Sequence, residues 1–425
     1  MPSEAFSSGP PPGLPPVTPP SGKFIVQLFL VPGLIVGLIV CMLLLFNWWI
    51  GGPRSPEAFL HKLDDPNPEV RWRAAADLAL VLKQDERLAG DGAFAIELAE
   101  RADRAREASE SAEKTFADRY ASLTEKEVQI ETAKLEPERN YLQYLCACLG
   151  YFRVPAGVEI LDKLASQESS LEPQALAARR RRAVWALADL GENLRHFDEA
   201  KLPDQDVILA SLDRLKGEMD SAAARKVATQ LQDRRAGKRS ALGVDKTLVK
   251  CADSRDSFLR ELTALALSFW QGSAAETELM EKTLLKLAHD DGREESWVEK
   301  ENEAHADQPR SIVKTPGLRV RYNAVAALAR RGSKKVPLDQ LEEMLDAGRL
   351  SELCVVRRPD GVEQPDEAFI VQAQVAALQA VTELHRKQPE MDLSSVRAQV
   401  DKLTEDPNPD LRAPARATQE VLASK

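Results

Sequence analysis

The sequence is poor in the residues that most often carry catalysis and metal binding. It holds five cysteines and five histidines in 425 residues. It contains no Walker loop, GxGxxG, HExxH, GxSxG or CxxC motif. Cys41 lies in an apolar run, and Cys146 and Cys148 are separated by one residue, so their spacing argues against a disulfide framework and indicates buried free thiols. The sequence therefore predicts no cofactor, no metal site and no enzymatic activity.

Aromatic residues are also scarce, at 5% of the chain against 29% for charged residues. Ala, Leu, Arg and Glu prevail over Val, Thr and Tyr, so helix formers outweigh strand formers and we expect little or no sheet. The formal net charge is -10. Because Glu4 and Lys23 cancel, all of that charge belongs to the part after Ile50. A domain this acidic is a poor general binder of phosphate backbones, so we expect no nucleic-acid partner.

The one long run without a charged residue, from Phe24 to Ile50, predicts a transmembrane helix. A helix of this length reaches about 40 Å, against a hydrocarbon core of about 30 Å. A cleaved signal peptide is disfavoured because Lys23 is the only cation before the run, and the run itself is too long. Trp48 and Trp49 lie at its end, where indole rings favour the headgroup layer. We therefore expect a single-pass protein of the cell membrane.

Small residues recur along this run. Gly33, Gly37 and Cys41 follow one another at a spacing of four, which predicts that two such helices can approach closely as a homodimer. An equally good interpretation is that Pro32 kinks the helix and that the glycines have no role in a dimer. More cations follow the run than precede it, so the positive-inside rule favours a cytoplasmic position for the rest of the chain.

One motif occurs twice after the apolar run, as DPNPEVR at residues 65–71 and as DPNPDLR at residues 406–412. The aspartate that precedes the first proline is pushed out of helical geometry, which ends a preceding helix. Asn67 and Asn408 are then predicted N-caps, each followed by a proline at the first helical position and by an acidic residue. The motif therefore predicts a corner between two helices.

A second pattern, rich in alanine and leucine, also occurs twice. It reads AVWALA at residues 183–188, with Gly191 behind it, and AVAALA at residues 324–329, with Gly332 behind it; both glycines are predicted C-caps. Together with the corner motif, these residues resemble HEAT repeats, particularly the short bacterial kind also found in phycobilin lyases. Their second helix commonly opens with Asp-Pro-x-x-Val-Arg and continues with an Ala-rich face. The resemblance implies a solenoid of helix pairs.

The pattern is irregular. Thr315-Pro316 and Val320-Arg321 compete as the start of one helix, so its register stays open, and Pro414 inside the last helix predicts a kinked or degenerate terminal cap. The expected fold is all-α: an irregular HEAT-like α-solenoid with helical insertions, preceded by one transmembrane helix. Its expected parts are a disordered Pro-rich tail (1–23), the transmembrane helix (24–50), a first repeat (51–93), a long charged helical insertion (94–136), repeats (137–200), a helical insertion with a basic loop (201–256), and repeats with an acidic loop at 290–317 (257–425).

Arginines supply the candidate interaction residues. Arg179 and Arg180 open a run of four arginines, which a helix distributes around its circumference, so the run makes no single patch. One interpretation is that stacking aligns some of them with Arg71, Arg321 and Arg412 as an edge that binds acidic partners. The favoured interpretation is that these arginines form salt bridges to acidic residues of adjacent repeats.

The sequence as a whole predicts a membrane-anchored scaffold. Its partners are the lipid bilayer and one or more unidentified proteins, which it binds through an extended helical surface without catalysis. One alternative is an enzyme or cofactor-handling protein, which the resemblance to phycobilin lyases implies. Another is a membrane-tethered regulatory sensor, in which the long charged insertion moves against the stack.

Overall fold

The computed structural model divides the chain into two compact units, Met1–Ala58 and Phe59–Lys425. The helix α2 (Pro56–Leu63) straddles the boundary. The residues that the structure describes are 30, 33–42, 56–168, 173–200, 202–218, 222–292, 296–297 and 312–424.

In the first unit, residues 33–42 are helical and all of their side chains are exposed. The predicted tail and most of the predicted span, including Phe24, Pro32, Trp48, Trp49 and Ile50, lie outside the described residues. Among the residues that are described, no helix is both long enough and apolar enough to cross a membrane.

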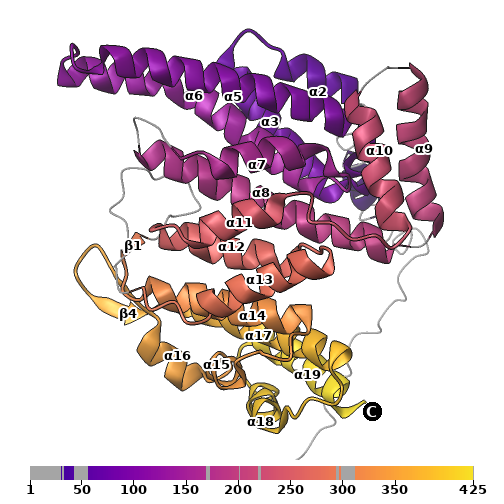
Figure 1. Cartoon of the computed structure of the whole chain (residues 1–425), viewed down its shortest axis with the longest axis vertical. Helices are drawn as coiled ribbons and strands as arrows, with labels where there is room; N and C mark the ends of the chain where they lie inside the picture. Colours follow the sequence, from indigo (N-terminus) through magenta and orange to yellow (C-terminus); the bar gives the residue numbers. More distant parts are fainter. Residues whose placement is uncertain are drawn as a thin grey trace, which may run out of the picture. The chain divides into compact units, whose positions relative to one another are not determined.

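The second unit is built from two layers of helices (Figure 1). In one layer each helix contacts the next helix of the same layer, and we call this the continuous layer. It consists of α3 (Pro68–Gln84), α6 (Glu125–Tyr151), α8 (Pro173–Glu199), α12 (Ser257–Phe269), α14 (Pro316–Arg331), α17 (Glu367–Lys387) and α19 (Pro409–Ala423).

The other layer covers one side of the continuous layer. It consists of α5 (Gly92–Tyr120), α7 (Val158–Ser166), α11 (Val244–Ala252), α13 (Ala274–Leu287), α15 (Leu338–Glu343), α16 (Ala347–Leu353) and α18 (Ser394–Leu403). Apolar side chains from both layers form one core cluster. The structure therefore confirms a helical repeat solenoid. The side of the continuous layer that these helices leave uncovered is called the free face below.

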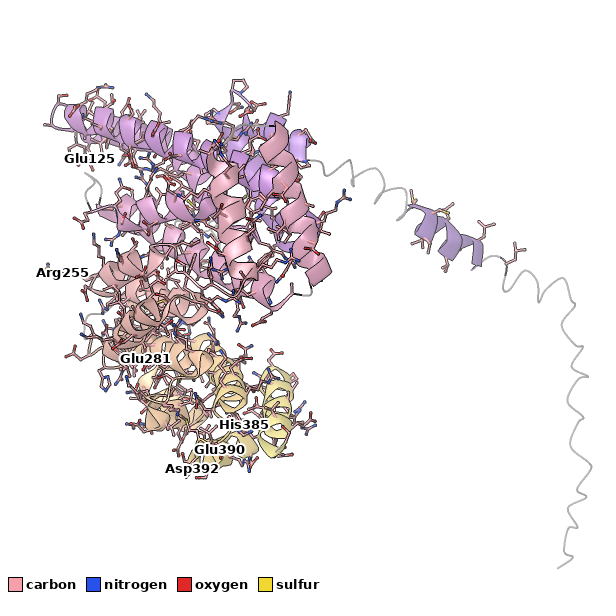
Figure 2. The ribbon with its side chains drawn as sticks, turned by 45° about the vertical axis from the view of Figure 1, so that its right-hand side comes forward. Glu125, Arg255, Glu281, His385, Glu390 and Asp392 are labelled. Atoms are coloured by element: carbon pink, nitrogen blue, oxygen red, sulfur yellow. The ribbon has the colours of Figure 1, made fainter. Side chains whose placement is uncertain are left out.

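The longest elements of the solenoid come from the charged segment that we predicted as an insertion at 94–136. It forms α5 and the first part of α6, which pack as an antiparallel pair whose tip carries Glu125 (Figure 2). Residue 137, the expected start of the next repeats, lies inside α6, because Pro137 is accommodated within that helix. The segment 201–256 holds a hairpin of α9 (Leu202–Glu218) and α10 (Ala222–Arg235), then α11. The remaining short elements are α4 (Glu86–Ala89) and η1 (Pro155–Gly157).

The structure is predominantly helical, as expected, but it is not strictly all-α. The described residues include a small antiparallel sheet with the strand order β1-β2-β3-β4. Its strands are β1 (Ser296–Trp297), β2 (Ile312–Val313), β3 (Val355–Arg357) and β4 (Glu363–Pro365). β2 and β3 are rich in β-branched residues, which favour strands. Such short runs are invisible in the composition of the whole chain, and two of the strands lie in the segment predicted as an acidic loop.

Local helix signals are largely confirmed. Asn67 Oδ1 accepts a hydrogen bond from the Glu69 amide at 3.0 Å, and Asn408 Oδ1 accepts one from the Asp410 amide at the same distance. α14 begins at Pro316, which resolves its register, and Gly332 ends it with φ +74°. Left-handed backbone of this kind favours glycine.

Gly191 is not the C-cap that its spacing predicts, because α8 continues to Glu199. The glycine serves close packing instead. A Cβ at position 191 would lie 2.8 Å from Nε1 and 2.9 Å from Cδ1 of Trp270, which is fully buried. The same indole Nε1 donates to the Leu187 carbonyl at 2.8 Å. Pro414 likewise lies inside α19, which continues to Ala423.

The substitution Gly191→Ala should lower the free energy of unfolding by about 1 to 3 kcal/mol, because the added methyl group displaces the Trp270 ring from its hydrogen bond. Gly348→Ala is the matched control, since that glycine is also helical and its Cβ would meet nothing closer than 3.4 Å. Urea unfolding followed by circular dichroism measures both variants. Equal stability of the two would show that the close approach at Gly191 has no energetic weight.

Candidate functional site

Arginine side chains join successive helices of the continuous layer. In the described residues, three arginines each contact an acidic residue and an aromatic ring on the next helix of the layer. The sets are Arg71 with Glu138 and Tyr141, Arg181 with Asp256 and Phe258, and Arg319 with Asp366 and Phe369. We call these sets the arginine clamps. Each combines a charge-assisted hydrogen bond with a cation–π contact.

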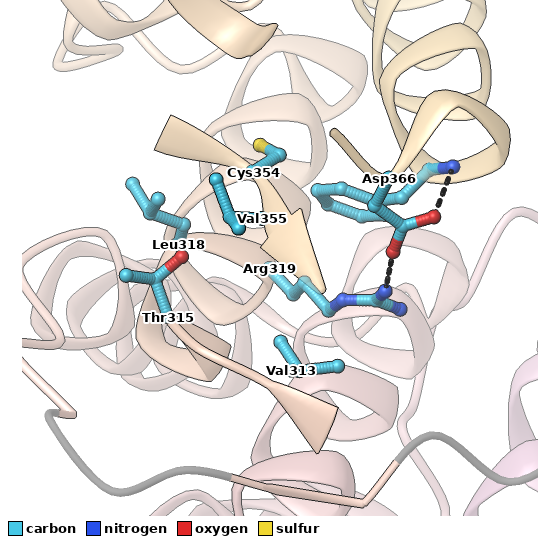
Figure 3. Close-up of a pocket in the computed structure, with 8 residues that line it drawn as sticks. Val313, Thr315, Leu318, Arg319, Cys354, Val355 and Asp366 are labelled. Atoms are coloured by element: carbon cyan, nitrogen blue, oxygen red, sulfur yellow. Dashed lines mark hydrogen bonds and ion pairs between the residues drawn. The ribbon is translucent and has the colours of Figure 1, made fainter. Parts of the chain in front are cut away.

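The second and third clamps show the geometry best. Arg181 donates through Nε and Nη2 to both carboxylate oxygens of Asp256, at 2.7 and 2.9 Å. In the third clamp the Arg319 guanidinium carbon lies 4.3 Å from the centroid of the Phe369 ring, and its Nη2 donates to Asp366 (Figure 3). Asp256 and Asp366 are also the N-caps of α12 and α17, so one carboxylate satisfies both its own helix and the arginine of the preceding one.

Of the arginines predicted to form one edge, only Arg71 belongs to a clamp, and the others make different contacts. Arg71 belongs to a clamp, whereas Arg179 bonds to Glu113 of α5 and Arg180 donates to the Ala165 carbonyl at 3.0 Å. Arg412 donates to the Asp406 carbonyl at 2.9 Å, and the Nε of Arg321 is buried without a hydrogen bond. Sequence reasoning missed Arg181 and Arg319. Their partners share a local pattern: an aspartate at the start of the next helix is followed by a phenylalanine two or three residues later. The role of the edge in partner binding stays a prediction.

The basic run at 234–239 is occupied by contacts within the chain. Arg234 is buried in an ion pair with Asp198 at 2.8 Å, and Arg239 reaches the same carboxylate at 3.4 Å. Arg235 pairs with Asp206 at 2.6 Å. The run therefore joins the α9–α10 hairpin to the end of α8.

The free face carries large aromatic side chains on its first helices. Trp185 of α8 is 45% exposed. Tyr144 and Tyr151, two turns apart on α6, are half-buried, and the Tyr144 ring stacks on Trp72 with centroids 5.9 Å apart. Exposed and half-exposed tryptophan and tyrosine are the residues that contribute most to protein interfaces.

Two carboxylates accompany these rings. Asp189 and Glu192 lie on α8 one turn apart, and neither has an ion-pair partner among the described residues. Burial, with a further contribution from Glu192, raises the pKa of Asp189 to about 6. Burial likewise raises the pKa of Glu261 on α12 to about 6, although the nearby Arg319 opposes the shift.

These raised pKa values have a consequence for stability. Both carboxyls are neutral in the folded and unfolded chain below about pH 4, so the fold pays nothing there. As the pH rises through 6, the folded state must bury charges that the unfolded chain keeps in water, which costs up to about 2 to 3 kcal/mol for each group.

Asp189→Asn and Glu261→Gln should therefore raise the free energy of unfolding at about pH 7.5 and leave it nearly unchanged at about pH 4. Asp77→Asn, which replaces an exposed carboxylate on α3, should have little effect at either pH. Denaturant titrations at the two pH values measure this difference. A destabilising effect of the first two substitutions at the higher pH would contradict the assignment.

A small pocket lies beside the third clamp, between the sheet and the starts of α14 and α17 (Figure 3). It has a volume of about 10 Å³ and is lined by Val313, Thr315, Leu318, Arg319, Cys354, Val355, Asp366 and Phe369. Ligand pockets usually measure about 300 to 1,000 Å³. Burial raises the pKa of the Cys354 thiol to about 12, so this thiol is a poor nucleophile at neutral pH. In the described part of the chain, no group of three or more His, Cys, Asp or Glu side chains is arranged to hold a metal ion.

Comparison with known proteins gives no family. No protein-family profile matches the chain, and no curated protein matches it. Among solved structures, the chain is similar to a designed armadillo repeat protein at 14% identity, with a TM-score of 0.30, over 86% of this chain and 99% of that one. It is also similar to an engineered protein at 15% identity, with a TM-score of 0.20, over 87% and 99% of the two chains. The fold assignment rests on the helix contacts described above.

Proposed function

We propose that this chain is a membrane-tethered scaffold that binds partner proteins through the free face of its solenoid, without catalysis. The observation that carries the proposal is the exposure of Trp185 on α8, at the end of a row of half-buried aromatic rings on α3 and α6 of that face. A monomeric soluble surface seldom presents such rings together unless they contact something. The row spans three helices, so binding energy is distributed along the stack.

The apolar segment supports the tether. Its described helical residues, 33–42, include Leu34, Ile35 and Val36, whose exposed fractions are 63%, 53% and 59%. A helix that is apolar on all sides is suited to a hydrophobic environment. Together with the uncharged run from Phe24 to Ile50, this supports a single-pass anchor. The excess of cations after the run supports a cytoplasmic position for the solenoid. A tether raises the effective concentration of membrane-bound partners.

A homodimer through this segment is a further part of the proposal. A Cβ added at Gly33 or Gly37 would meet nothing within 4 Å, so each glycine leaves its backbone accessible to a second helix.

The anchor predicts how the chain fractionates. The full chain should stay with membranes after alkaline carbonate extraction, because an inserted helix leaves only with detergent. A chain that starts at Gly51 should appear in the soluble fraction. Recovery of the full chain in the soluble fraction would end the membrane proposal, and protease accessibility in sealed vesicles of known orientation would place the solenoid.

If partner proteins bind the free face, a crosslinker on that face should capture them, whereas one on the covering layer should not. A photoreactive phenylalanine analogue in place of Trp185 should crosslink to other proteins in intact cells. The same analogue in place of Leu279, an exposed residue of α13 in the covering layer, should not. If position 279 captured the same proteins with the same yield, the free face would have no special role.

A further inference from the structure

Two arginines in the middle of the free face flank one phenyl ring. Arg195 comes from α8 and Arg330 from α14, and Phe269 lies on α12 between these helices. Both guanidinium carbons lie 5.9 Å from the centroid of the Phe269 ring. Both side chains are half-buried, so water reaches them from one side only.

These two guanidinium groups lack the partners that the arginine clamps have. Arg195 forms no hydrogen bond with the described residues: its Nε is buried and unsatisfied, and the nearest carboxylate, that of Glu199, is 3.9 Å away. Among the described residues, the Arg330 side chain donates only to the neutral Gln379 side chain, at 3.4 Å. A guanidinium has five N–H donors and no means of losing its charge, so unsatisfied burial is costly.

Arg321 is also incompletely bonded, but it does not belong to this pair. It precedes Arg330 by nine residues, which places it on the opposite side of α14. The two arginines of the free face are therefore a separate feature.

Further cations lie close by. Arg331 donates to the carbonyls of Leu267 and Trp270 at 2.9 and 2.6 Å, and Lys387 donates to the Arg330 carbonyl at 2.6 Å. These bonds occupy both groups, but they add positive charge without adding a carboxylate.

Of the nearest acidic side chains, Glu383 bonds to Arg386 at 3.2 Å, and Glu192 makes no ion pair within the described residues. Burial lowers the pKa of Arg330 and of Lys387; Arg195 lowers both further, while Glu192 opposes the shift of Arg330 and Glu383 opposes both. Three carboxylates, those of Glu192, Glu199 and Glu383, thus act on four cations, Arg195, Arg330, Arg331 and Lys387, so positive charge remains in excess here.

We propose that Arg195 and Arg330 together bind an oxyanion, a carboxylate or a phosphate group, on an acidic segment of a partner protein, with Phe269 as the apolar floor beneath it. The planar fork of each guanidinium matches the two oxygens of such a group. An oxyanion there would complete the hydrogen bonds that the chain leaves open. This inference rests on the proposed function, because it names the chemistry of the partner on the same face.

The test is a binding measurement on the full chain in detergent micelles. The probes are fluorescent twelve-residue peptides of alternating glutamate and leucine, the same peptide with phosphoserine in place of glutamate, and the same peptide with lysine. Fluorescence anisotropy should show binding of the acidic peptides and not of the lysine peptide. Comparison of the two acidic peptides identifies carboxylate or phosphate as the preferred group.

Arg195→Gln and Arg330→Gln should each weaken binding of the acidic peptide by about tenfold or more, as expected for the loss of a charge-assisted hydrogen bond. Arg386→Gln is the matched control, because it removes the same charge from an exposed position on α17. It should change the affinity by less than about twofold, as expected for an exposed charge. Arg330→Lys keeps the charge but loses the fork, so it should lie between the wild type and Arg330→Gln. Thermal unfolding confirms that each variant is folded.

Equal losses in Arg386→Gln and Arg330→Gln would reduce the effect to bulk charge and overturn the inference. Unchanged affinity in both glutamine variants would also overturn it. Binding to phosphatidylserine vesicles, with no binding to either acidic peptide, would assign the site to lipid and overturn the protein partner. A failure here with the crosslink from position 185 intact removes this inference alone, whereas loss of that crosslink removes the proposed function.

Discussion

The solenoid depends on the way in which each helix of the continuous layer satisfies the ends of its neighbours. A helix leaves four amides and four carbonyls without partners at its two ends. Here Asp256 and Asp366 cap the first turns of α12 and α17 and receive an arginine from the helix before. At the opposite end, Arg331 of α14 donates to the last carbonyls of α12, and Lys387 of α17 donates to those of α14. α14 and α17 are thus joined at both ends, and α12 is joined to α8 at its start and to α14 at its end, which fixes the relative register of these helices.

Between the joined ends, small residues set the spacing. A Cβ on Gly150 of α6 would lie 2.9 Å from the Ala186 carbonyl oxygen of α8, and one on Gly191 would meet the Trp270 ring. The hydrogen bonds at the helix ends and the close approach of the helices at their middles depend on each other. The hydrogen bonds at the ends form only if the helices approach closely, and close approach is stable only if no buried polar group is left without a partner.

What the sequence predicts correctly is what a few neighbouring residues decide. Asn67 and Asn408 cap helices through their own next amides, and Gly332 ends α14 through its own backbone conformation, so each could be recognised from local spacing. Gly191 looked the same locally and has a different role, because Trp270 reaches it from another helix.

In the candidate site, too, local residues could be recognised from the sequence, whereas contacts with distant residues could not. Arg181 rather than Arg179 forms a clamp because the phase of α8 turns it toward Asp256, which lies far away in the sequence. Nothing in the run of four arginines distinguishes them. The sheet was missed for a related reason: Ile312 and Val313 pair with Arg357 and Val356, which lie beyond the three helices α14, α15 and α16.

In the part of the chain that the structure describes, charged side chains that lack a hydrogen bond or an ion-pair partner occur on the free face, along α8. Asp189 and Glu192 lack ion-pair partners among the described residues, and Arg195, the next residue in the series, lacks a hydrogen bond. Acidic and basic side chains of this face nevertheless interact, because Glu192 acts electrostatically on Arg330 of the neighbouring α14 and Glu199 lies 3.9 Å from Arg195. Unsatisfied polar groups in an otherwise consistent fold are expected where function opposes stability. On this face the group that the described residues leave buried without a hydrogen bond is Nε of Arg195, one of the two arginines for which an oxyanion is proposed above.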